Sequence, residues 1–347
     1  MKAVVYRDRN KVSLEERPMP TVLKSTDAIV KTTLCTICTS DLHILHGTVP
    51  AAEKGVILGH EFVGEVVQAG ADVQKVKPGD RVAVNVETFC GKCFFCWHGF
   101  VNNCTDEYGG WSLGCRIDGG QAEYVRIPYA DQGLNLIPEH VTDEQALFTG
   151  DLLSTGFWGA RISEISEQDT VAVIGAGPAG LCAMMCAALY HPHKIAAVDI
   201  REDRLEIVRK NGLADVTLNP EKTDVVQALR NLTQGRGADR VIEAAGGKNT
   251  FEMAWKMARP NAIVTVVAMY EENQILPLVE MYGKNLTFKT GGVDAADCTE
   301  ILQLIGEGKL DTGCLITHRG KLEDAEKAYE IFAGQKEGVV KYVLDCR

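Results

Sequence analysis

The chain has 347 residues, enough for two domains, and its 46% hydrophobic and 24% charged residues are ordinary for a folded soluble protein. A formal net charge of −11 argues against a nucleic-acid partner, because a phosphate backbone is bound by a basic surface. Residues 1–6 meet the charged residues 7–9 too soon for the apolar core of a signal peptide, so we expect a cytoplasmic protein.

The first part of the chain, up to residue 150, carries short β-branched runs separated by turns. The runs at 28–32, 62–67 and 81–84 predict strands, and the last of them follows a turn at 77–80. Helical periodicity is scarce in this part. The pattern therefore predicts an antiparallel, β-rich domain of barrel-like type.

Four of the twelve cysteines lie in one short stretch with the spacing C-x2-C-x2-C-x7-C, namely Cys90, Cys93, Cys96 and Cys104. Clustered cysteines in a chain without a secretory signal usually bind metal. Four thiolates close the coordination shell of a zinc ion, so this stretch predicts a structural zinc site. An iron–sulfur cluster is the competing interpretation of the spacing, and four crowded free thiols are the simplest one.

From residue 170 the pattern changes to strands that alternate with helices. Strands are predicted at 171–174, 195–199, 240–243 and 263–268, and helices after the first strand, at 204–211 and at 249–258. Such alternation predicts a parallel sheet that is covered on both faces.

Residues 170–190 carry no charge over a length that could span a bilayer. Glycines and a proline at 175–180 divide them into a short β-branched run and a later helical run, so we expect a buried strand, a turn and a buried helix. No membrane span is predicted.

The chain after residue 288 is mixed, with helices predicted at 299–306 and 322–333 and a last strand at 339–344. Such a strand suits a return to the first domain. We therefore expect an α/β protein with one domain from 1–153 and 290–347, which includes the cysteine lobe 88–105, and a second domain from 154–289.

A G-x-G-x-x-G pattern lies between the strand at 171–174 and the following helix. Its residues are Gly175, Gly177, Pro178, Ala179 and Gly180. Glycines at these points allow a tight turn and let a pyrophosphate approach the helix N-terminus. A packing turn without a ligand is the alternative.

The choice of cofactor depends on a pair of residues that follow the glycine pattern, Asp199 and Arg204. Asp199 ends the next strand, nineteen residues after Gly180. A carboxylate there binds the adenosine ribose and repels a 2′-phosphate, which favours NAD over NADP. Arg204, one turn further, contacts the ribose in this interpretation, or binds a 2′-phosphate in the alternative.

A second set of metal ligands is spread along the chain: Cys38, His60 and Asp151. Together they offer a sulfur, a nitrogen and an oxygen ligand and leave one position open, as a catalytic zinc requires. Asp151 is a lone acid in an apolar stretch, so it should meet a cation. Taken singly, each has a simpler interpretation: a buried thiol, a turn histidine and a helix N-cap.

These residues identify a family. The chain resembles the zinc-dependent medium-chain alcohol dehydrogenases over essentially its whole length, and the likeness is greatest to bacterial secondary-alcohol dehydrogenases. It is carried by residues 38–43 (CTSDLH), 59–64 (GHEFVG), 77–82 (KPGDRV), the four-cysteine lobe, Asp151 and 175–180. The resemblance implies a GroES-like β-rich catalytic domain, completed by the C-terminal segment, and an inserted Rossmann domain with a doubly wound parallel sheet.

The same resemblance assigns roles to single residues. Cys38, His60 and Asp151 would hold the catalytic zinc, and Glu61 would enter its coordination shell transiently. Ser40 and His43 match the family's proton relay, and Lys341 matches a position that approaches the cofactor phosphate. Trp111 is a candidate for the wall of the substrate pocket, with a purely structural role as the alternative.

The implied function is hydride transfer between a secondary alcohol, or its ketone, and NAD(H), with two zinc ions per subunit, one catalytic and one structural. Polyol, butanediol or steroid-alcohol dehydrogenases and formaldehyde dehydrogenase-like enzymes of the same family are the alternatives. Many secondary-alcohol members lack the cysteine lobe that this chain keeps. A non-enzymatic NAD- and zinc-binding redox sensor is the alternative of another class. The family likeness also suggests a homodimer or homotetramer, with no nucleic-acid or membrane partner.

Overall fold

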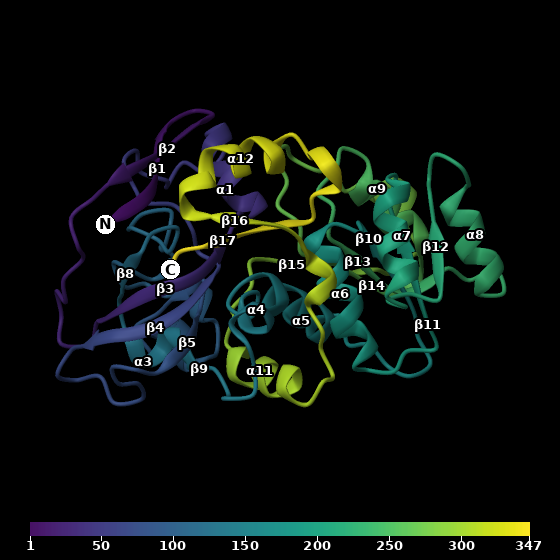
Figure 1. Cartoon of the computed structure of the whole chain (residues 1–347). Coiled ribbons are helices and arrows are strands. Elements are labelled where there is room, and N and C mark those ends of the chain that lie inside the picture. Colours follow the sequence, from purple (N-terminus) through teal and green to yellow (C-terminus); the bar gives the residue numbers. More distant parts are fainter. The chain divides into compact units, whose positions relative to one another are not determined.

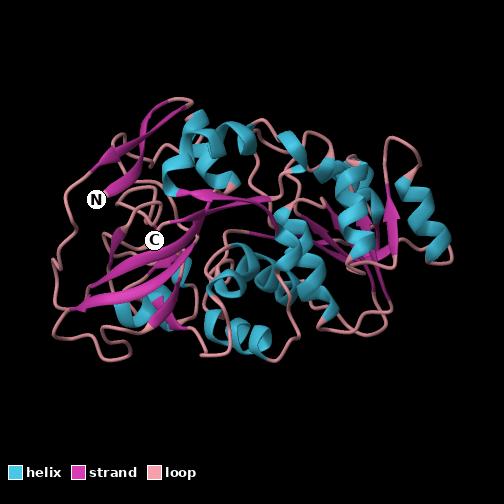
Figure 2. Ribbon diagram, viewed as in Figure 1, coloured by secondary structure: helices cyan, strands magenta, loops and turns pink.

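A computed structural model describes all 347 residues of the chain. The chain forms two compact units, shown in Figures 1 and 2. The first contains Met1–Ser154 and Asp294–Arg347, and the second contains Thr155–Val293. The sequence placed these boundaries after residues 153 and 289. No helix is both long enough and apolar enough to cross a lipid bilayer.

The first unit is built on a seven-stranded sheet in the order β16-β17-β3-β4-β5-β9, with β8 paired to β3. Its strands are β3 (Ala28–Thr36), β4 (Phe62–Ala69), β5 (Arg81–Val84), β8 (Tyr124–Ile127), β9 (Leu134–Leu136), β16 (Ile316–Lys321) and β17 (Lys341–Asp345). All pairings but β16–β17 are antiparallel. The three strands predicted from the early β-branched runs lie in β3, β4 and β5.

The strand β17 lies inside this sheet, between β16 and β3. Val343, Leu344 and Asp345 of β17 face residues 34–36 of β3 in antiparallel register, and Figure 1 shows the yellow β17 beside the purple β3. The return of the C-terminal strand to the first domain is thus confirmed. β3 leads the backbone to Cys38, and β17 begins at Lys341.

The remaining elements of the first unit are short. Two-stranded sheets pair β1 (Lys2–Asp8) with β2 (Lys11–Glu16) and β6 (Glu87–Thr88) with β7 (Gly110–Trp111). The helices are α1 (Thr39–His46), α2 (Phe94–Trp97), α3 (Ala130–Gly133), α4 (Asp143–Ala146), α11 (Cys298–Gly306) and α12 (Ala325–Ala333). One apolar core joins the sheet to α1 and α12 and includes Ile44, Phe62 and Tyr329.

The second unit is a six-stranded sheet in the order β12-β11-β10-β13-β14-β15, and every pairing in it is parallel. Its strands are β10 (Thr170–Ile174), β11 (Lys194–Val198), β12 (Val216–Leu218), β13 (Ala238–Glu243), β14 (Ala258–Val266) and β15 (Thr287–Thr290). The predicted parallel α/β class is confirmed. The outer strands β12 and β15 lie outside the predicted series, since strands of three or four residues are too short to show a period.

The helices of the second unit flank its strands (Figure 2). They are α6 (Pro178–Ala188), α7 (Glu202–Lys210), α8 (Val225–Leu232), α9 (Thr250–Met257) and α10 (Leu278–Met281), while α5 (Leu152–Ile162) contains the first boundary between the units. All five residues of β10 are buried, as expected for a central parallel strand covered on both faces. The uncharged stretch 170–190 is therefore strand, turn and helix, as predicted.

Candidate functional site

Three elements of the first unit bring Cys38, His60 and Asp151 together. Cys38 is the N-cap of α1, His60 lies just before β4, and Asp151 precedes α5. Oδ2 of Asp151 lies 3.5 Å from Sγ of Cys38 and 3.4 Å from Nε2 of His60. One ligand atom from each residue lies within 4.8 Å of the other two. The side chains form the three-donor constellation that the sequence predicted.

A buried carboxylate faces the other nitrogen of the His60 ring. Nδ1 of His60 lies 3.3 Å from Oδ1 of Asp41, and both side chains are almost fully buried. Oδ2 of Asp41 accepts hydrogen bonds from the backbone N–H of Cys38 and from the Gln121 amide, whose oxygen accepts one from Tyr329. A carboxylate behind a ligating histidine fixes the orientation of the ring and its tautomer.

The charges of the site act on the pKa values of its members. Burial opposes the charged form of His60, but Asp41 and Asp151 outweigh it and raise the pKa of the imidazole. Burial likewise opposes the charged form of Asp151, but the hydrogen bond and charge of His60 hold its pKa below the usual range. In the absence of metal the two groups therefore form an ion pair, and a cation that binds them must displace the proton of His60.

Glu61 and Lys341 form a buried ion pair beside this constellation. Nζ of Lys341 donates to Oε2 of Glu61 and, at 3.2 Å, to the carbonyl of Ile37, and each side chain is only 1% exposed. Burial opposes the charged ammonium, but Cys38 and Glu61 outweigh it and raise the pKa of Lys341. Burial raises the pKa of Glu61 to about 7, although Lys341 lowers it. A contact of Lys341 with a cofactor phosphate stays a prediction, and it would require Nζ to leave Glu61.

A further buried acid, Glu87, lies in the same neighbourhood. It pairs with Trp111 across the β6–β7 ribbon, and the Trp111 ring packs edge-on against His60 with 5.3 Å between ring centres. Burial raises the pKa of Glu87 to about 8, and the negative charge of Asp151 acts in the same direction. The placement of Trp111 agrees with a pocket wall, and that role stays a prediction.

The two residues predicted to form a proton relay lie on one face of α1. Ser40 and His43 are three residues apart, a spacing at which helical side chains are neighbours. Oγ of Ser40 lies 3.7 Å from Sγ of Cys38, whereas the His43 ring is half-buried and its Nδ1 lies 3.5 Å from Oγ1 of Thr48. Ser40 therefore lies at the metal constellation and His43 lies further along the helix.

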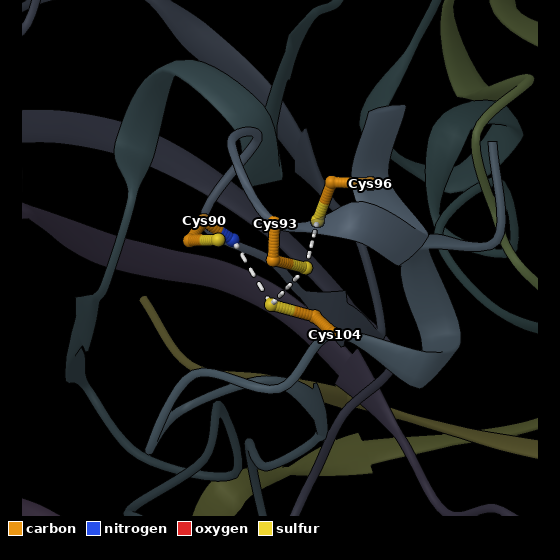
Figure 3. A group of neighbouring side chains, drawn as sticks. All are labelled: Cys90, Cys93, Cys96 and Cys104. Carbon is orange, nitrogen blue, oxygen red and sulfur yellow. Dashed lines mark hydrogen bonds between the residues drawn. The ribbon is translucent and has the colours of Figure 1, made fainter. Parts of the chain in front are cut away.

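The four cysteines of the lobe also converge (Figure 3). Sγ of Cys93 lies 3.4 Å from that of Cys96 and 3.9 Å from that of Cys104, close to the spacing of about 3.8 Å that tetrahedral zinc with bonds of about 2.3 Å imposes on sulfur. A backbone N–H of Cys96 lowers the pKa of the Cys93 thiol to about 6, whereas burial raises the pKa of the Cys96 thiol to about 12. These donors fit a closed tetrahedral shell.

The glycine loop of the second unit has the conformation that its sequence predicted. Gly175 has φ +99° and a Cβ there would lie 3.1 Å from Ala245, while a Cβ on Gly180 would lie 1.8 Å from the carbonyl oxygen of Gly175. Pro178 begins α6, where its missing N–H is not needed. The loop thus brings bare backbone to the N-terminus of a buried helix, which suits a pyrophosphate.

Asp199 follows β11 and reaches back to this loop. Its Oδ2 accepts a hydrogen bond of 2.6 Å from the backbone N–H of Ala176, and its Oδ1 accepts one of 2.8 Å from Arg201. Arg204 lies in α7 and is buried, and burial lowers the pKa of its guanidinium. The carboxylate is thus at the loop, as predicted, while the guanidinium lies against the protein interior.

Several residues of the site were not predicted from the sequence. They are Gln121 and Tyr329, which support Asp41, and Glu87, together with the pairing of Lys341 with Glu61. Among these residues only Glu87 could have been found from the sequence, because it is an acid in a largely apolar run, residues 82–89. The others lie in unrelated stretches, and only the fold brings them to the site.

The chain matches the family model of the alcohol dehydrogenase GroES-like domain over residues 24–139 and that of the zinc-binding dehydrogenases over residues 178–307. An alcohol dehydrogenase of Cupriavidus necator is 37% identical, with 99% of this chain and 98% of that protein covered. The NADP-dependent isopropanol dehydrogenase of Clostridium beijerinckii is 33% identical, with 99% of both chains covered.

The solved structures agree with these relatives. The alcohol dehydrogenase TADH from Thermus sp. ATN1 superimposes with a TM-score of 0.92 at 34% identity, with 100% of both chains covered. The fold agrees with that of the enzymes that the chain matches, and two groups of side chains that could hold a metal ion fit the zinc-binding dehydrogenase model. The chain therefore belongs to the zinc-binding medium-chain alcohol dehydrogenases, which transfer a hydride between an alcohol and a nicotinamide cofactor.

Proposed function

We propose that this enzyme interconverts secondary alcohols and ketones with NAD(H), using a catalytic zinc held by Cys38, His60 and Asp151. The observation that carries the proposal is the convergence of one sulfur, one nitrogen and one oxygen donor within 4.8 Å. Three protein ligands leave a coordination position for substrate. The relative from Clostridium beijerinckii is named for isopropanol, a secondary alcohol, which supports this substrate class.

The residues of the site divide the work of the reaction. Zinc bound there supplies a Lewis acid that lowers the pKa of an alcohol hydroxyl toward neutrality. Ser40, beside Cys38, would accept the hydroxyl proton as it gives up its own, and His43, on the same helix face, would release a proton to solvent. Asp41 holds the His60 ring in place, and Lys341 balances the charge of Glu61. A transient contact of Glu61 with the metal belongs to the same proposal.

NAD is the proposed cofactor, bound at Gly175, Gly177, Pro178, Ala179 and Gly180. The carboxylate of Asp199 at this loop would accept hydrogen bonds from the adenosine ribose and repel a 2′-phosphate. Arg204 is buried, so it is poorly placed to bind that phosphate instead. A second zinc at the four cysteines completes the proposed metal content, and with all four positions filled it has a structural role.

A homodimer or homotetramer is the proposed assembly, and a surface of the second unit supports it. Ile275, Leu278, Val279 and Tyr282 are 72–93% exposed, and the nearby strand β15 is the outer strand of the parallel sheet. Exposed apolar side chains and an unpaired strand edge are both features that suit contact with a second copy of the chain. Light scattering of the wild type and of Val279→Lys tests this assignment, and a wild-type monomer would refute it.

The catalytic assignment is tested by an alcohol panel and one variant. Zinc-loaded enzyme should reduce NAD faster than NADP, with isopropanol and other secondary alcohols turned over faster than formaldehyde or bulky steroid alcohols. Asp151→Ala should lose the catalytic zinc and turnover, whereas the exposed Asp72→Ala should keep both. One zinc per chain and no turnover of any alcohol by the wild type would favour a redox sensor. Full activity of Asp151→Ala with unchanged zinc content would refute the ligand assignment.

A further inference from the structure

Two buried polar atoms beside the metal constellation have no hydrogen-bond partner. One is Oε2 of Glu87, an acceptor, and the other is Nε1 of Trp111, which can only donate. The Glu87 side chain is nearly enclosed, with 6% of the residue exposed. A buried donor or acceptor without a partner is rare in native proteins and destabilises the fold unless something binds it. This complementary pair therefore requires an explanation.

The backbone places both side chains on the same face of one ribbon. Glu87 and Trp111 are directly opposite in the antiparallel β6–β7 pair, and directly opposite residues project their side chains to the same side. The Trp111 ring packs against His60 with 5.3 Å between ring centres. The residue before Glu87, Val86, donates its N–H to Gly150, the neighbour of Asp151. Both unpartnered atoms thus belong to the surroundings of two metal ligands.

The protein offers no hydrogen-bond partner of its own to Oε2 of Glu87. Arg116 is the arginine whose charge acts on the Glu87 pKa, but its guanidinium donates to the carbonyls of Glu107 and Gly109 and to Oγ of Ser112. The Asn85 side chain bonds the backbone N–H of Glu87 and the carbonyl of Ala295. The acid is held in place through its backbone, and its Oε2 is left to interact with a group that enters the site.

We propose that Glu87 and Trp111 bind a second hydroxyl group of the substrate, so that the preferred substrates are alcohols with a hydroxyl on the adjacent carbon. A hydroxyl donates one hydrogen bond and accepts others, so it satisfies Glu87 and Trp111 at once. This inference rests on the proposed function, since it places the reacting hydroxyl at Cys38, His60 and Asp151.

The same geometry discriminates against simple alcohols. A substrate that fills the site with an alkyl group leaves a buried carboxylate and a buried indole N–H unpaired, and sites of that kind reject the analogue that lacks the polar group. A water molecule that bridges the two atoms is the competing occupant, and an ammonium group of an amino alcohol is another. The following experiment distinguishes all three.

The experiment measures kcat/KM of zinc-loaded enzyme for sec-butanol and for the butanediol with adjacent hydroxyls. Wild type should prefer the diol. Glu87→Leu should reduce the ratio of diol to monoalcohol kcat/KM by about 10- to 100-fold, the usual effect of leaving a buried hydroxyl without its hydrogen-bond partner. Trp111→Phe, which loses only the N–H, should reduce it by about 3- to 10-fold. Glu87→Gln keeps an acceptor of the same shape, so its ratio of diol to monoalcohol kcat/KM should lie between those of wild type and Glu87→Leu.

A binding measurement gives a readout that does not depend on turnover. Calorimetric titration with the hydroxyketone product should show tighter binding than butanone in wild type, and Glu87→Leu should remove the difference. Zinc content and melting temperature of each variant serve as folding controls. If Glu87→Leu fails to fold, Trp111→Phe and Glu87→Gln still decide the question, because each keeps the size and shape of the original side chain.

The measurements distinguish a failure of this inference from a failure of the proposed function. Turnover of neither alcohol by the wild type would refute the proposed function itself. Turnover of both, with a ratio that Glu87→Leu and Trp111→Phe leave unchanged, would refute this inference and indicate a bridging water. A wild-type preference for an amino alcohol over the diol, lost in Glu87→Leu but kept in Trp111→Phe, would also refute it and assign the site to an ammonium group.

Discussion

Replacement of Lys341 with methionine tests whether this residue balances the buried charge of Glu61. Methionine keeps an unbranched side chain up to Cε and removes the ammonium group with its charge and hydrogen bonds. Because both side chains are 1% exposed, water cannot take the place of the ammonium. Removal of one partner of a buried ion pair lowers the free energy of unfolding by about 3–5 kcal/mol, since the other charge is left uncompensated. We expect a loss of this size above the pKa of Glu61.

Protonation of Glu61 limits the loss and makes it depend on pH. The pKa of Glu61 is raised from 4.5 to about 7 in the folded protein, so between these values the folded state binds more protons than the unfolded state and stability falls as pH rises. At about pH 5.5 the carboxyl is therefore already protonated in the folded protein, whereas at about pH 8 it is charged and its neutralisation costs about 1.4 kcal/mol per pH unit above its pKa. The loss caused by Lys341→Met should therefore become small in mild acid.

Urea titrations followed by circular dichroism at the two pH values give the measurement. The double variant Lys341→Met/Glu61→Leu removes both charges and should recover most of the stability, because apolar replacement of a buried pair is often neutral. Lys54→Met breaks an exposed pair with Asp8 in the same unit and should change little. The reasoning fails if the double variant is as unstable as Lys341→Met, or if the loss is equal at both pH values.

Three further outcomes are expected. Cys93→Ser should bind one zinc per chain fewer and expose the lobe to limited proteolysis; unchanged zinc content would argue against the structural site. Asp41→Asn should weaken zinc binding about 10- to 100-fold in chelator competition, because the residue behind a ligating histidine orients it; unchanged affinity would leave Asp41 a purely structural residue. Zinc affinity should fall with pH below the raised pKa of His60, since each bound ion displaces its proton; a flat profile would contradict the ion pair of His60 with Asp151.

Much of the fold and of both candidate metal sites could be predicted from the sequence. The cysteine spacing and the glycine pattern are local, so each carries its structure within a few residues of itself. Cys38, His60 and Asp151 are far apart in sequence, and their common site was predicted because the acid in an apolar stretch required a cation. The resemblance to a known family supplied the same three residues.

The residues that were not predicted have partners that no local pattern reveals. Lys341 meets Glu61 because β17 inserts beside β3, and nothing in either stretch specifies that pairing. Glu87 lies in a strand of two residues, too short to show which side chain is buried. Gln121 and Tyr329, which support Asp41, are separated by 208 residues. These contacts are set by the tertiary arrangement of the sheet and α12.

The position of β17 has a consequence for the order in which the molecule is made. The second unit is one continuous segment, Thr155–Val293, and all of it is synthesised before the last strand of the first unit. Until then β3 lacks its β17 neighbour, and Glu61 lacks its cation. We therefore expect the nascent first unit to expose an open sheet edge, a hazard for aggregation. Emergence of residues 341–345 from the ribosome would be the step that covers this edge and gives Glu61 its cation.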